Sequence, residues 1–477
     1  MPWLRPFYAE ARLLAHALRN GLWRSLSAGS RRPGYAQKVL TWPTRLPDHA
    51  DSSEIVAHLR RAGLRVQEGG HAFYLPPQPG LAATLGSVIE RYPPGSGFKV
   101  LRDFRGLEEA HYLHPERQTR LRRRLIGTPR GQLIAANYLR RLDLGPRVWD
   151  VCLLRAGRLS MPAFVVHHIE GTVPDAEECA AFMQRLRTAL AETELRISVP
   201  NWERKRDFRC PSCNGNLLRD ARGALSYIDF QNFSIRNPQR LLDSTVDGAT
   251  GQLHFGDGRV YRRNEYLYQS IPGLRRARKR DTVTRFHTIR RLLREQGVDF
   301  HNRLVLDIGC NAGVMLHHAL ATGAWWALGW DRPAVARQAR AIADALGFTR
   351  LDVTPAELSE RYDFGASIPE WLHRHLSDAV VFFLAIRQHT GIPGSLVDLP
   401  WRALVYEGHQ GESLAEADRH AEIFATPGVR VGHRLDVHDG DSRRWPLITL
   451  VREPPAAARH PGPAVPPGRA HRGQRPT

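Results

Sequence analysis

Long apolar runs are missing from this sequence of 477 residues. A membrane-spanning helix requires about 20 consecutive apolar residues, and no segment approaches that length. The first 26 residues are not expected to act as a secretory signal, because charged residues interrupt them: Arg5, Glu10, Arg12, Arg19 and Arg24. We therefore expect a cytoplasmic protein.

Cysteine and acidic residues are also scarce. Five cysteines in a chain of this length cannot form the disulfide framework of a small secreted protein. The 48 Asp and Glu residues are outnumbered by 68 Lys and Arg, which gives a formal net charge of +20. This excess favours a polyanionic partner such as nucleic acid, anionic lipid head groups or a phosphorylated glycan. An arginine-rich composition imposed by a GC-rich genome is the alternative explanation.

The chain is longer than one hydrophobic core usually organises, and its patterns divide it into five parts. Residues 1–35 have the spacing of an amphipathic helix followed by a linker, which suits either a membrane surface or packing on the protein itself. Residues 36–247 mix helices, expected near 53–64 and 132–142, with strands, expected near 98–101 and 163–168. Residues 248–300 form a basic connector, in which residues 274–294 are expected to be helical. Residues 301–453 alternate strands with helices, as in a parallel α/β sheet. Residues 454–477 lack large apolar side chains and are expected to be disordered.

Residues 305–313 form an apolar strand followed by a turn of small residues, and a helix is expected directly after it. A backbone that approaches a ligand closely needs residues without bulky side chains. The N–H groups at the start of the following helix then face the ligand. The next strand, residues 326–330, ends at Asp331, whose carboxylate can accept hydrogen bonds from both hydroxyls of a ribose. These features predict a nucleotide-type site at the ends of two neighbouring strands.

The spacing of this turn, D-x-G-x-N-x-G, differs from the G-x-G-x-x-G of NAD-binding proteins. It resembles motif I of class I S-adenosylmethionine (SAM)-dependent methyltransferases, although most members have glycine where this chain has asparagine, a residue that tolerates left-handed conformations. Residues 378–386 and 403–409 resemble the fourth and fifth strands of these enzymes. The resemblance implies an α/β, Rossmann-like domain with a mostly parallel seven-stranded sheet and SAM as cofactor. The residues expected to bind SAM are Asp307, Gly309, Asn311, Gly313, Asp331 and Asp352.

Three ionisable residues follow the fourth and fifth strands, where α/β sheets place their ligands: His389, Glu407 and His409. Transfer of a methyl group from a sulfonium requires mainly alignment of the reactants. An oxygen acceptor also benefits from a general base. Each of the three is a candidate for that base, and a purely structural hydrogen bond is the alternative for each.

Residues 214–231 resemble the catalytic-loop and DFG region of protein-kinase-like proteins. Asn216 and Asp229 match the two positions that hold magnesium against the nucleotide phosphates. Glu170 follows a segment similar to the hinge that binds adenine, and Lys99 resembles the phosphate-contacting lysine. The resemblance implies an α+β, protein-kinase-like N-terminal domain, with ATP and Mg as ligands.

The same segment departs from the kinase pattern at several positions. Pro211 stands where the catalytic aspartate is expected, and Asp207 is offset from that position. Gln132 lies near the place of the helix C glutamate, and no glycine-rich loop precedes Lys99. The spacing therefore predicts the fold better than it predicts phosphoryl transfer, and a pseudokinase is an alternative.

Both domain types together resemble the bacterial kinase–methyltransferases of O-antigen polysaccharide biosynthesis, in which the domain order is reversed. That resemblance implies methylation of a hydroxyl on a glycan or related metabolite, with peripheral contact at the inner membrane face. The methyltransferase part is also similar to enzymes that modify the wobble uridine of tRNA. This similarity gives an RNA methyltransferase as the alternative, with basic residues 275–294 on the phosphates. A third hypothesis is a pseudokinase scaffold that binds SAM without catalysis.

Overall fold

The computed structural model describes most of the chain between residues 40 and 453. The described residues are 40–41, 52–68, 72–81, 83, 91–101, 125–126, 129–156, 159–191, 193–197, 216–228, 230, 233–235, 238–247, 266–271, 277–409, 411–438 and 444–453. The predicted N-terminal helix, the predicted C-terminal tail, Pro211 and Asp229 lie outside them. Among the described residues, no helix is long and apolar enough to cross a membrane.

The N-terminal unit is built on a six-stranded sheet with the order β1-β6-β7-β4-β3-β2. Its strands β2, β3, β4, β6 and β7 pair antiparallel, and β1 pairs parallel with β6. The bounds are β1 Leu40–Thr41, β2 Gln67–Glu68, β3 Ala72–Leu75, β4 Ser96–Leu101, β6 Val148–Ala156 and β7 Leu159–His167.

Helices cover both faces of this sheet. Side chains alternate along β7, so that Ala163 and Val165 pack with α2 (Ser52–Arg61), whereas Phe164 and Val166 pack with α6 (Pro129–Arg141) and α7 (Ala176–Ala191). The helices predicted near residues 53–64 and 132–142 and the strands predicted near 98–101 and 163–168 are confirmed.

Short elements complete the N-terminal part and lead to the second unit. Two small sheets have the orders β11-β10-β8 and β5-β12-β9, and β13 pairs with β14. The bounds are β5 Leu125–Ile126, β8 Gly171–Thr172, β9 Leu195–Ile197, β10 Leu217–Asp220, β11 Leu225–Tyr227, β12 Phe233–Ile235, α9 Pro238–Asp247, β13 Tyr266–Gln269 and β14 Ala277–Arg280. The basic segment predicted to be helical therefore begins as strand β14 and becomes helical only in α10 (Thr282–Glu295).

The C-terminal unit contains a seven-stranded sheet with the order β17-β16-β15-β18-β19-β21-β20. The first five strands of this order pair parallel, and β21 runs antiparallel to both β19 and β20. The bounds are β15 Leu304–Ile308, β16 Trp326–Asp331, β17 Leu351–Pro355, β18 Val380–Leu384, β19 Ala403–Glu407, β20 Val429–His438 and β21 Arg444–Arg452. A mostly parallel seven-stranded, Rossmann-like sheet is thus confirmed.

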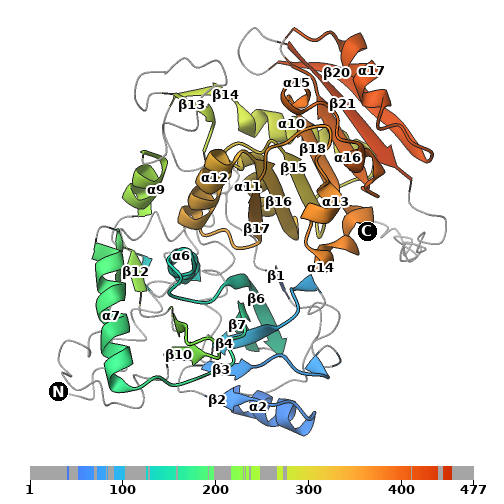
Figure 1. Cartoon of the computed structure of the whole chain (residues 1–477). Helices are drawn as coiled ribbons and strands as arrows, with labels where there is room; N and C mark the ends of the chain where they lie inside the picture. Colours follow the sequence, from blue (N-terminus) through green and yellow to red (C-terminus); the bar gives the residue numbers. More distant parts are fainter. Residues whose placement is uncertain are drawn as a thin grey trace, which may run out of the picture.

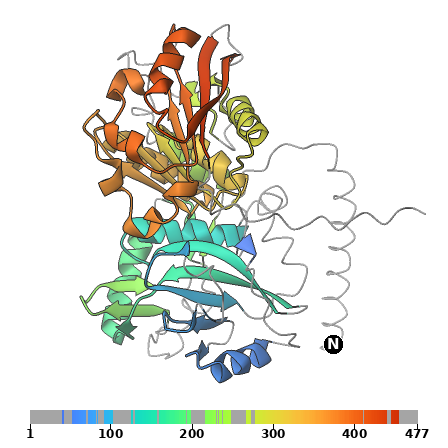
Figure 2. The same cartoon turned by 90° about the vertical axis from the view of Figure 1, so that its right-hand side faces the viewer.

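Two helical layers enclose this sheet (Figures 1 and 2). One hydrophobic cluster joins the sheet to α10, α11 (Val314–Ala321) and α12 (Pro333–Leu346). A second cluster, on the other face, includes α13 Phe364–Ser367, α14 Glu370–His373, α16 Gly394–Asp398 and α17 Leu414–Glu422. The turn elements η5 Leu376–Asp378 and α15 Arg387–Thr390 flank β18. Because α10 belongs to the first cluster, the core of this unit includes a helix that the sequence pattern assigned to the connector.

The two units meet at the amino ends of the parallel strands. Arg350, which precedes β17, is fully buried and forms an ion pair with Asp150 of β6 at 3.1 Å. Tyr92 donates a hydrogen bond to the same carboxylate at 2.7 Å, and Asn137 of α6 donates to the carbonyl oxygen of Phe348 at 3.0 Å. The N-terminal unit therefore packs against the edge opposite to the carboxyl ends of the strands.

Candidate functional site

The turn after β15 takes up an uncommon backbone conformation. Gly309, Asn311 and Gly313 all have positive φ angles, of 74°, 50° and 73°. A Cβ atom on Gly309 would lie 2.6 Å from Cδ1 of Ile386, so that only glycine fits there. Asn311 adopts the left-handed conformation that its residue type tolerates, as the sequence predicted. Gly313 is the N-cap of α11, and the free N–H groups of that helix face the turn.

Asp331 at the end of β16 is bonded to this turn. Its Oδ2 accepts the backbone N–H of Asn311 at 2.8 Å, and its Oδ1 accepts that of Arg332 at 2.8 Å. Burial raises the pKa of Asp331, although both backbone hydrogen bonds oppose the shift. The carboxylate remains partly exposed.

Asp307, inside β15, carries a buried carboxylate beside the same turn. The residue is 3% exposed, and its Oδ2 has no hydrogen-bond partner among the described residues. Burial raises the pKa of Asp307 to about 7, with a lowering effect from Arg285 and a further raising effect from Asp331. A buried carboxylate with an unused acceptor oxygen favours a cationic or hydrogen-bond-donating ligand group.

Glu407, a predicted candidate base, is bound to Arg285 of α10. The Nε atom of Arg285 lies 2.6 Å from Oε2 and its Nη2 lies 2.5 Å from Oε1 of Glu407. Both residues are buried, at 5% and 2% exposure. This pair fixes α10 to the end of β19, so the structure gives Glu407 a structural environment rather than that of an accessible base.

His389 and His409, the other two candidates, lie next to each other. Their rings meet edge to face, with centroids 5.4 Å apart. His389 is exposed, whereas His409 is 9% exposed and its Nε2 accepts the backbone N–H of Gln388 at 3.1 Å. Burial and the neighbouring His389 lower the pKa of His409 to about 4, so its ring is neutral near pH 7.

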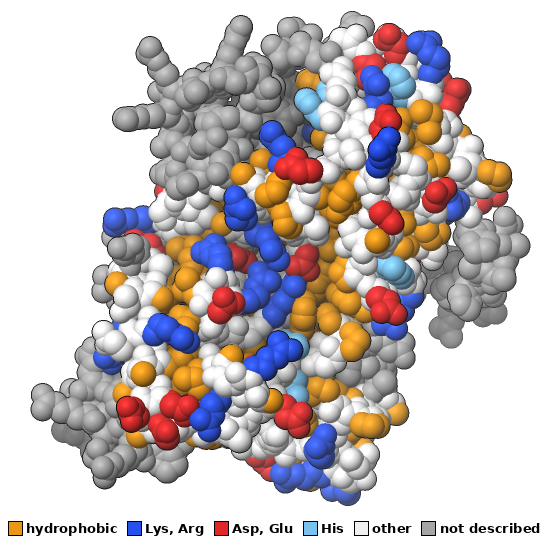
Figure 3. All heavy atoms as spheres, viewed as in Figure 1, with side chains coloured by type: hydrophobic (Ala, Val, Ile, Leu, Met, Phe, Trp, Pro, Cys, Tyr) orange, Lys and Arg blue, Asp and Glu red, His pale blue; other side chains and the backbone are white. Residues whose placement is uncertain are grey.

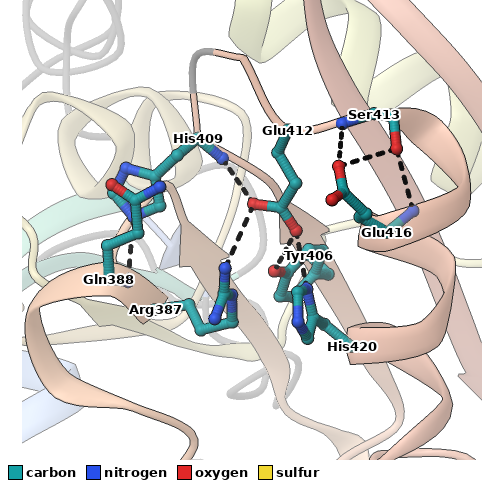
Figure 4. A network of polar contacts seen from close by, with 8 residues as sticks. All are labelled: Arg387, Gln388, Tyr406, His409, Glu412, Ser413, Glu416 and His420. Carbon is teal, nitrogen blue, oxygen red and sulfur yellow. Dashed lines mark hydrogen bonds and ion pairs between the residues drawn. The ribbon is translucent and has the colours of Figure 1, made fainter.

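A polar network that the sequence did not reveal supports this pair, and Figure 4 shows it from close by. Glu412 accepts hydrogen bonds from the backbone N–H of His409 at 2.9 Å and from the hydroxyl of Tyr406 at 3.0 Å. Its other contacts are with Nδ1 of His420 at 2.7 Å and with Arg387 at 3.8 Å. Burial alone would raise the pKa of Glu412, but these hydrogen bonds lower it. No motif pointed to Glu412, because its partners come from three separate elements.

Asp352 does not reach the strand ends. It pairs in register with Leu328, three residues before Asp331, and both its oxygens contact Nη2 of Arg147, at 2.7 and 2.6 Å. Its carboxylate therefore belongs to the contact between the two units. The structure brings together the other predicted cofactor residues and leaves Asp352 apart from them.

Of the residues predicted to bind a nucleotide in the N-terminal unit, Lys99 and Asn216 both contact Ile228. The Nζ atom of Lys99 donates to the carbonyl oxygen of Ile228 at 3.3 Å, next to the undescribed Asp229. The backbone of Asn216 accepts the N–H of Ile228 at 2.9 Å, and Glu170 is exposed. Among the described residues, no group of three or more His, Cys, Asp or Glu could hold a metal ion.

Tyr74 of β3 reaches past Gly97 of β4 to the segment after β7 that was compared with a hinge. Its hydroxyl bonds Nδ1 of His168 at 2.7 Å, and the two rings stack with centroids 5.6 Å apart. A Cβ atom on Gly97, two residues before Lys99, would clash with this hydroxyl.

The solved structures that resemble this protein match less than half of the chain. No protein-family model and no curated protein matches the sequence. A putative RNA methyltransferase, PH1948 from Pyrococcus horikoshii, is 16% identical, with 45% of this chain and 98% of that chain covered and a TM-score of 0.27. Magnesium protoporphyrin IX methyltransferase from Synechocystis PCC 6803 with bound SAH is 13% identical, with 36% and 83% covered and a TM-score of 0.26. A ribosomal protein L11 methylase from Lactobacillus delbrueckii subsp. bulgaricus is 14% identical, with 36% and 79% covered and a TM-score of 0.23. Because the sequence identities and TM-scores are this low, the function has to be inferred from the geometry of the site itself.

Proposed function

We propose that the C-terminal unit is a methyltransferase that uses SAM as its cofactor. The observation that carries this proposal is the unpartnered Oδ2 of the buried Asp307, next to a left-handed turn and to Asp331. Together they provide a negative charge, a close backbone approach and a ribose acceptor in one place. The parallel strand ends of an α/β sheet are the usual place for such a ligand.

The residues of the site fit the parts of SAM. Asp331 is the acceptor for the ribose hydroxyls, since a carboxylate has about four lone-pair positions and only two backbone bonds occupy it. Gly309 lets the turn adopt its left-handed backbone against Ile386, and Asp307 offers its free oxygen to the cationic amino acid part. When bound, SAM supplies a methyl group already activated by its sulfonium. The protein then mainly aligns the acceptor with that methyl group.

His389 is the proposed base of the reaction. It is exposed, and α15 begins directly after Ile386, which contacts the Gly309 turn. His409 is a positioning residue, because its Nε2 already accepts the N–H of Gln388 and its lowered pKa keeps it neutral. This arrangement suits an oxygen acceptor, whose proton must be removed as the methyl group arrives.

The methyl acceptor is a hydroxyl group carried by a polyanionic molecule. The net charge of +20 and the exposed His389 support a hydroxyl on either a phosphorylated glycan or RNA. The scaffold hypothesis, SAM binding without catalysis, predicts that the cofactor binds but no methyl group is transferred.

We further propose that the N-terminal unit is a kinase-like domain whose nucleotide site is closed. The helix α6 between β4 and β6 and the contact of Lys99 with Ile228 support the kinase-like part. The bond between Tyr74 and His168 supports the closure. We therefore expect the melting temperature of the protein to be the same with and without ATP and Mg. A clear rise would show that ATP binds.

Transfer of the methyl group tests the main proposal. Wild-type protein is incubated with methyl-labelled SAM and, separately, with total RNA and with a phosphorylated polysaccharide fraction. We expect label in one fraction, loss of transfer in Asp331→Ala, and wild-type transfer in the matched control Asp398→Ala, which removes an exposed carboxylate of α16. Equal transfer by Asp331→Ala and wild type would contradict the proposed site.

A further inference from the structure

An exposed row of arginines follows α12 away from the proposed cofactor site. Arg337, Arg340 and Asp344 share one side of this helix, because residues three, four and seven apart lie on the same face. Both arginines are exposed, with 43% exposure for the side chain of Arg340. The other side of the helix is buried through Val335, Ala336, Ala339, Ile342, Ala343 and Leu346.

The row continues onto the N-terminal unit through shared carboxylates. Arg140 and Arg141, at the end of α6, lie 3.5 and 3.8 Å from Asp344. Arg147 and Arg340 both reach Asp352, at 2.6 and 4.0 Å. Four guanidinium groups of this cluster thus share two carboxylates, which leaves a net positive charge of two.

Three of these four arginines face solvent more than the carboxylates do. The side chain of Asp344 is 5% exposed, against 25% and 37% for Arg140 and Arg141, and that of Asp352 is 18% exposed, against 43% for Arg340. The side chain of Arg147 is as buried as that of Asp352, so the exposed charge comes from the other three arginines. Figure 3 shows Lys and Arg side chains gathered on the face where α12 and α6 are in view.

The start of α12 lies next to the carboxyl end of β16. Arg332, the exposed N-cap of α12, directly follows Asp331. The helix has 14 residues and so extends for about 21 Å toward the contact with α6. A ligand lying along this row would have one end at the proposed methyl-transfer site.

We propose that the arginine row on α12 and α6 binds the phosphate backbone of an RNA substrate. This inference rests on the proposed methyltransferase function and names its substrate class. A single phosphate group on a glycan is bound by one or two arginines, whereas an extended row fits a chain with a phosphate on every nucleotide. Arginine suits this role because its planar guanidinium binds phosphate oxygens in pairs.

A lipid surface fits this row poorly. Membrane-surface sites combine basic residues with large apolar side chains that enter the acyl boundary. Among the described residues, the exposed large hydrophobics are Leu142, Val173 and Ile423. Of these, only Leu142 neighbours the row in sequence. The row therefore offers charge with a single exposed large apolar side chain beside it among the described residues.

Fluorescence anisotropy with a labelled single-stranded oligoribonucleotide tests the proposal. We compare wild type with the double variant Arg337→Glu/Arg340→Glu over a series of salt concentrations. We expect wild type to lose affinity steeply with salt, because phosphate binding releases counterions. In the double variant, we expect Kd to rise at least about tenfold and the log–log salt slope to fall by about 1.4, roughly 0.7 for each lost contact.

The matched control is Arg419→Glu/Arg430→Glu, with the same charge change on exposed residues of α17 and β20. We expect its Kd to stay within about twofold of wild type. An unchanged Kd in the α12 variant, or an equal loss in the control, would overturn the proposal. Displacement of RNA by a phosphorylated polysaccharide at the same phosphate concentration would overturn the assignment to RNA.

Calorimetry with S-adenosylhomocysteine separates this proposal from the function on which it rests. The α12 double variant keeps Asp307, Asp331 and the turn, so we expect it to bind this product as wild type does. If wild type fails to bind it, the methyltransferase proposal fails, whatever the RNA titration gives. If both proteins bind it but RNA affinity does not change, only the arginine row is refuted.

Discussion

The carboxylate of Asp331 accepts the backbone N–H of Asn311 at 2.8 Å, which joins the tip of β16 to the turn after β15. Asn311 is left-handed, and its own Oδ1 accepts the N–H of Ala312. These bonds hold the turn and the proposed ribose acceptor in a fixed relation before any ligand arrives. Such preorganisation lowers the free-energy cost of ordering a site on binding.

The pH dependence of cofactor affinity tests the role of Asp307. The pKa of Asp307 is raised to about 7, so its carboxyl group becomes protonated as the pH falls below that value. A neutral carboxyl group attracts a cation less than a carboxylate does. We expect the affinity for S-adenosylhomocysteine, measured by calorimetry, to rise between about pH 5.5 and 8. In Asp307→Asn the affinity should be lower and should change little over this range. An unchanged pH profile in the variant would remove Asp307 from the site.

The two histidines should differ in their effect on turnover. His389→Ala is expected to lower kcat by about 10²-fold or more, as for the loss of a general base, with KM for SAM unchanged. His409→Ala removes an acceptor for Gln388 and should lower kcat less. The deciding measurement is kcat of the two variants compared at one pH, because His389→Ala should show the larger loss. The control is His433→Ala on the distant strand β20, and a similar loss there would show that the effects are not local.

His317 should make the fold sensitive to acid. Its ring is fully buried against Phe348, and neither ring nitrogen has a hydrogen-bond partner among the described residues. Burial lowers the pKa of His317 to about 3, below the ordinary value of 6.5. The unfolded chain therefore binds more protons, and the stability present above pH 6.5 is lost as the pH falls toward 3.

His317→Phe is the variant that tests this contribution. We expect the free energy of unfolding to fall less steeply below pH 6.5 in the variant, by up to about 1.4 kcal/mol per pH unit. Urea unfolding at pH 7.5, 6 and 5, followed by tryptophan fluorescence, measures the difference. Parallel pH profiles for the variant and wild type would show that His317 does not contribute.

The contact between the two units depends on a buried charge pair. Arg350→Met leaves Asp150 buried without its ion-pair partner, and the carboxylate keeps hydrogen bonds from Tyr92 and from the backbone N–H of Val151. We expect a loss of about 3–5 kcal/mol in the free energy of unfolding, measured by urea titration. Arg141→Met, which removes a loose and more exposed pair with Asp344, should cost less than about 1 kcal/mol. Similar losses in both variants would contradict the importance of burial.

The sequence was sufficient to predict the strand tips at Asp307 and Asp331 and the left-handed turn between them. These features depend on local chemistry: a small-residue turn, an apolar strand and an acid at its end. The mostly parallel seven-stranded sheet followed from the resemblance to methyltransferases, and its strand order came from the structure. The position of Asp352 could not be predicted, because it depends on the register of β17 and on Arg147, which lies 205 residues away.

Long-range partners explain the other differences from the sequence predictions. Glu407 looked like an accessible acid at a strand end, but Arg285 from 122 residues earlier binds it. Glu412 and Tyr74 carry no motif, and their roles come from partners on other elements. The start of the basic segment forms β14 rather than a helix because β13 pairs with it. Each of these features depends on tertiary contacts that a local pattern does not encode.

The most direct test of the central claim is a calorimetric titration of S-adenosylhomocysteine into wild type, Asp331→Ala and the control Asp398→Ala. A cofactor site at the ends of β15 and β16 predicts micromolar binding to wild type and to the control, and a loss of at least about tenfold, or 1.4 kcal/mol, in Asp331→Ala. Absence of binding to folded wild-type protein, or equal binding to all three proteins, would contradict a SAM site at Asp331.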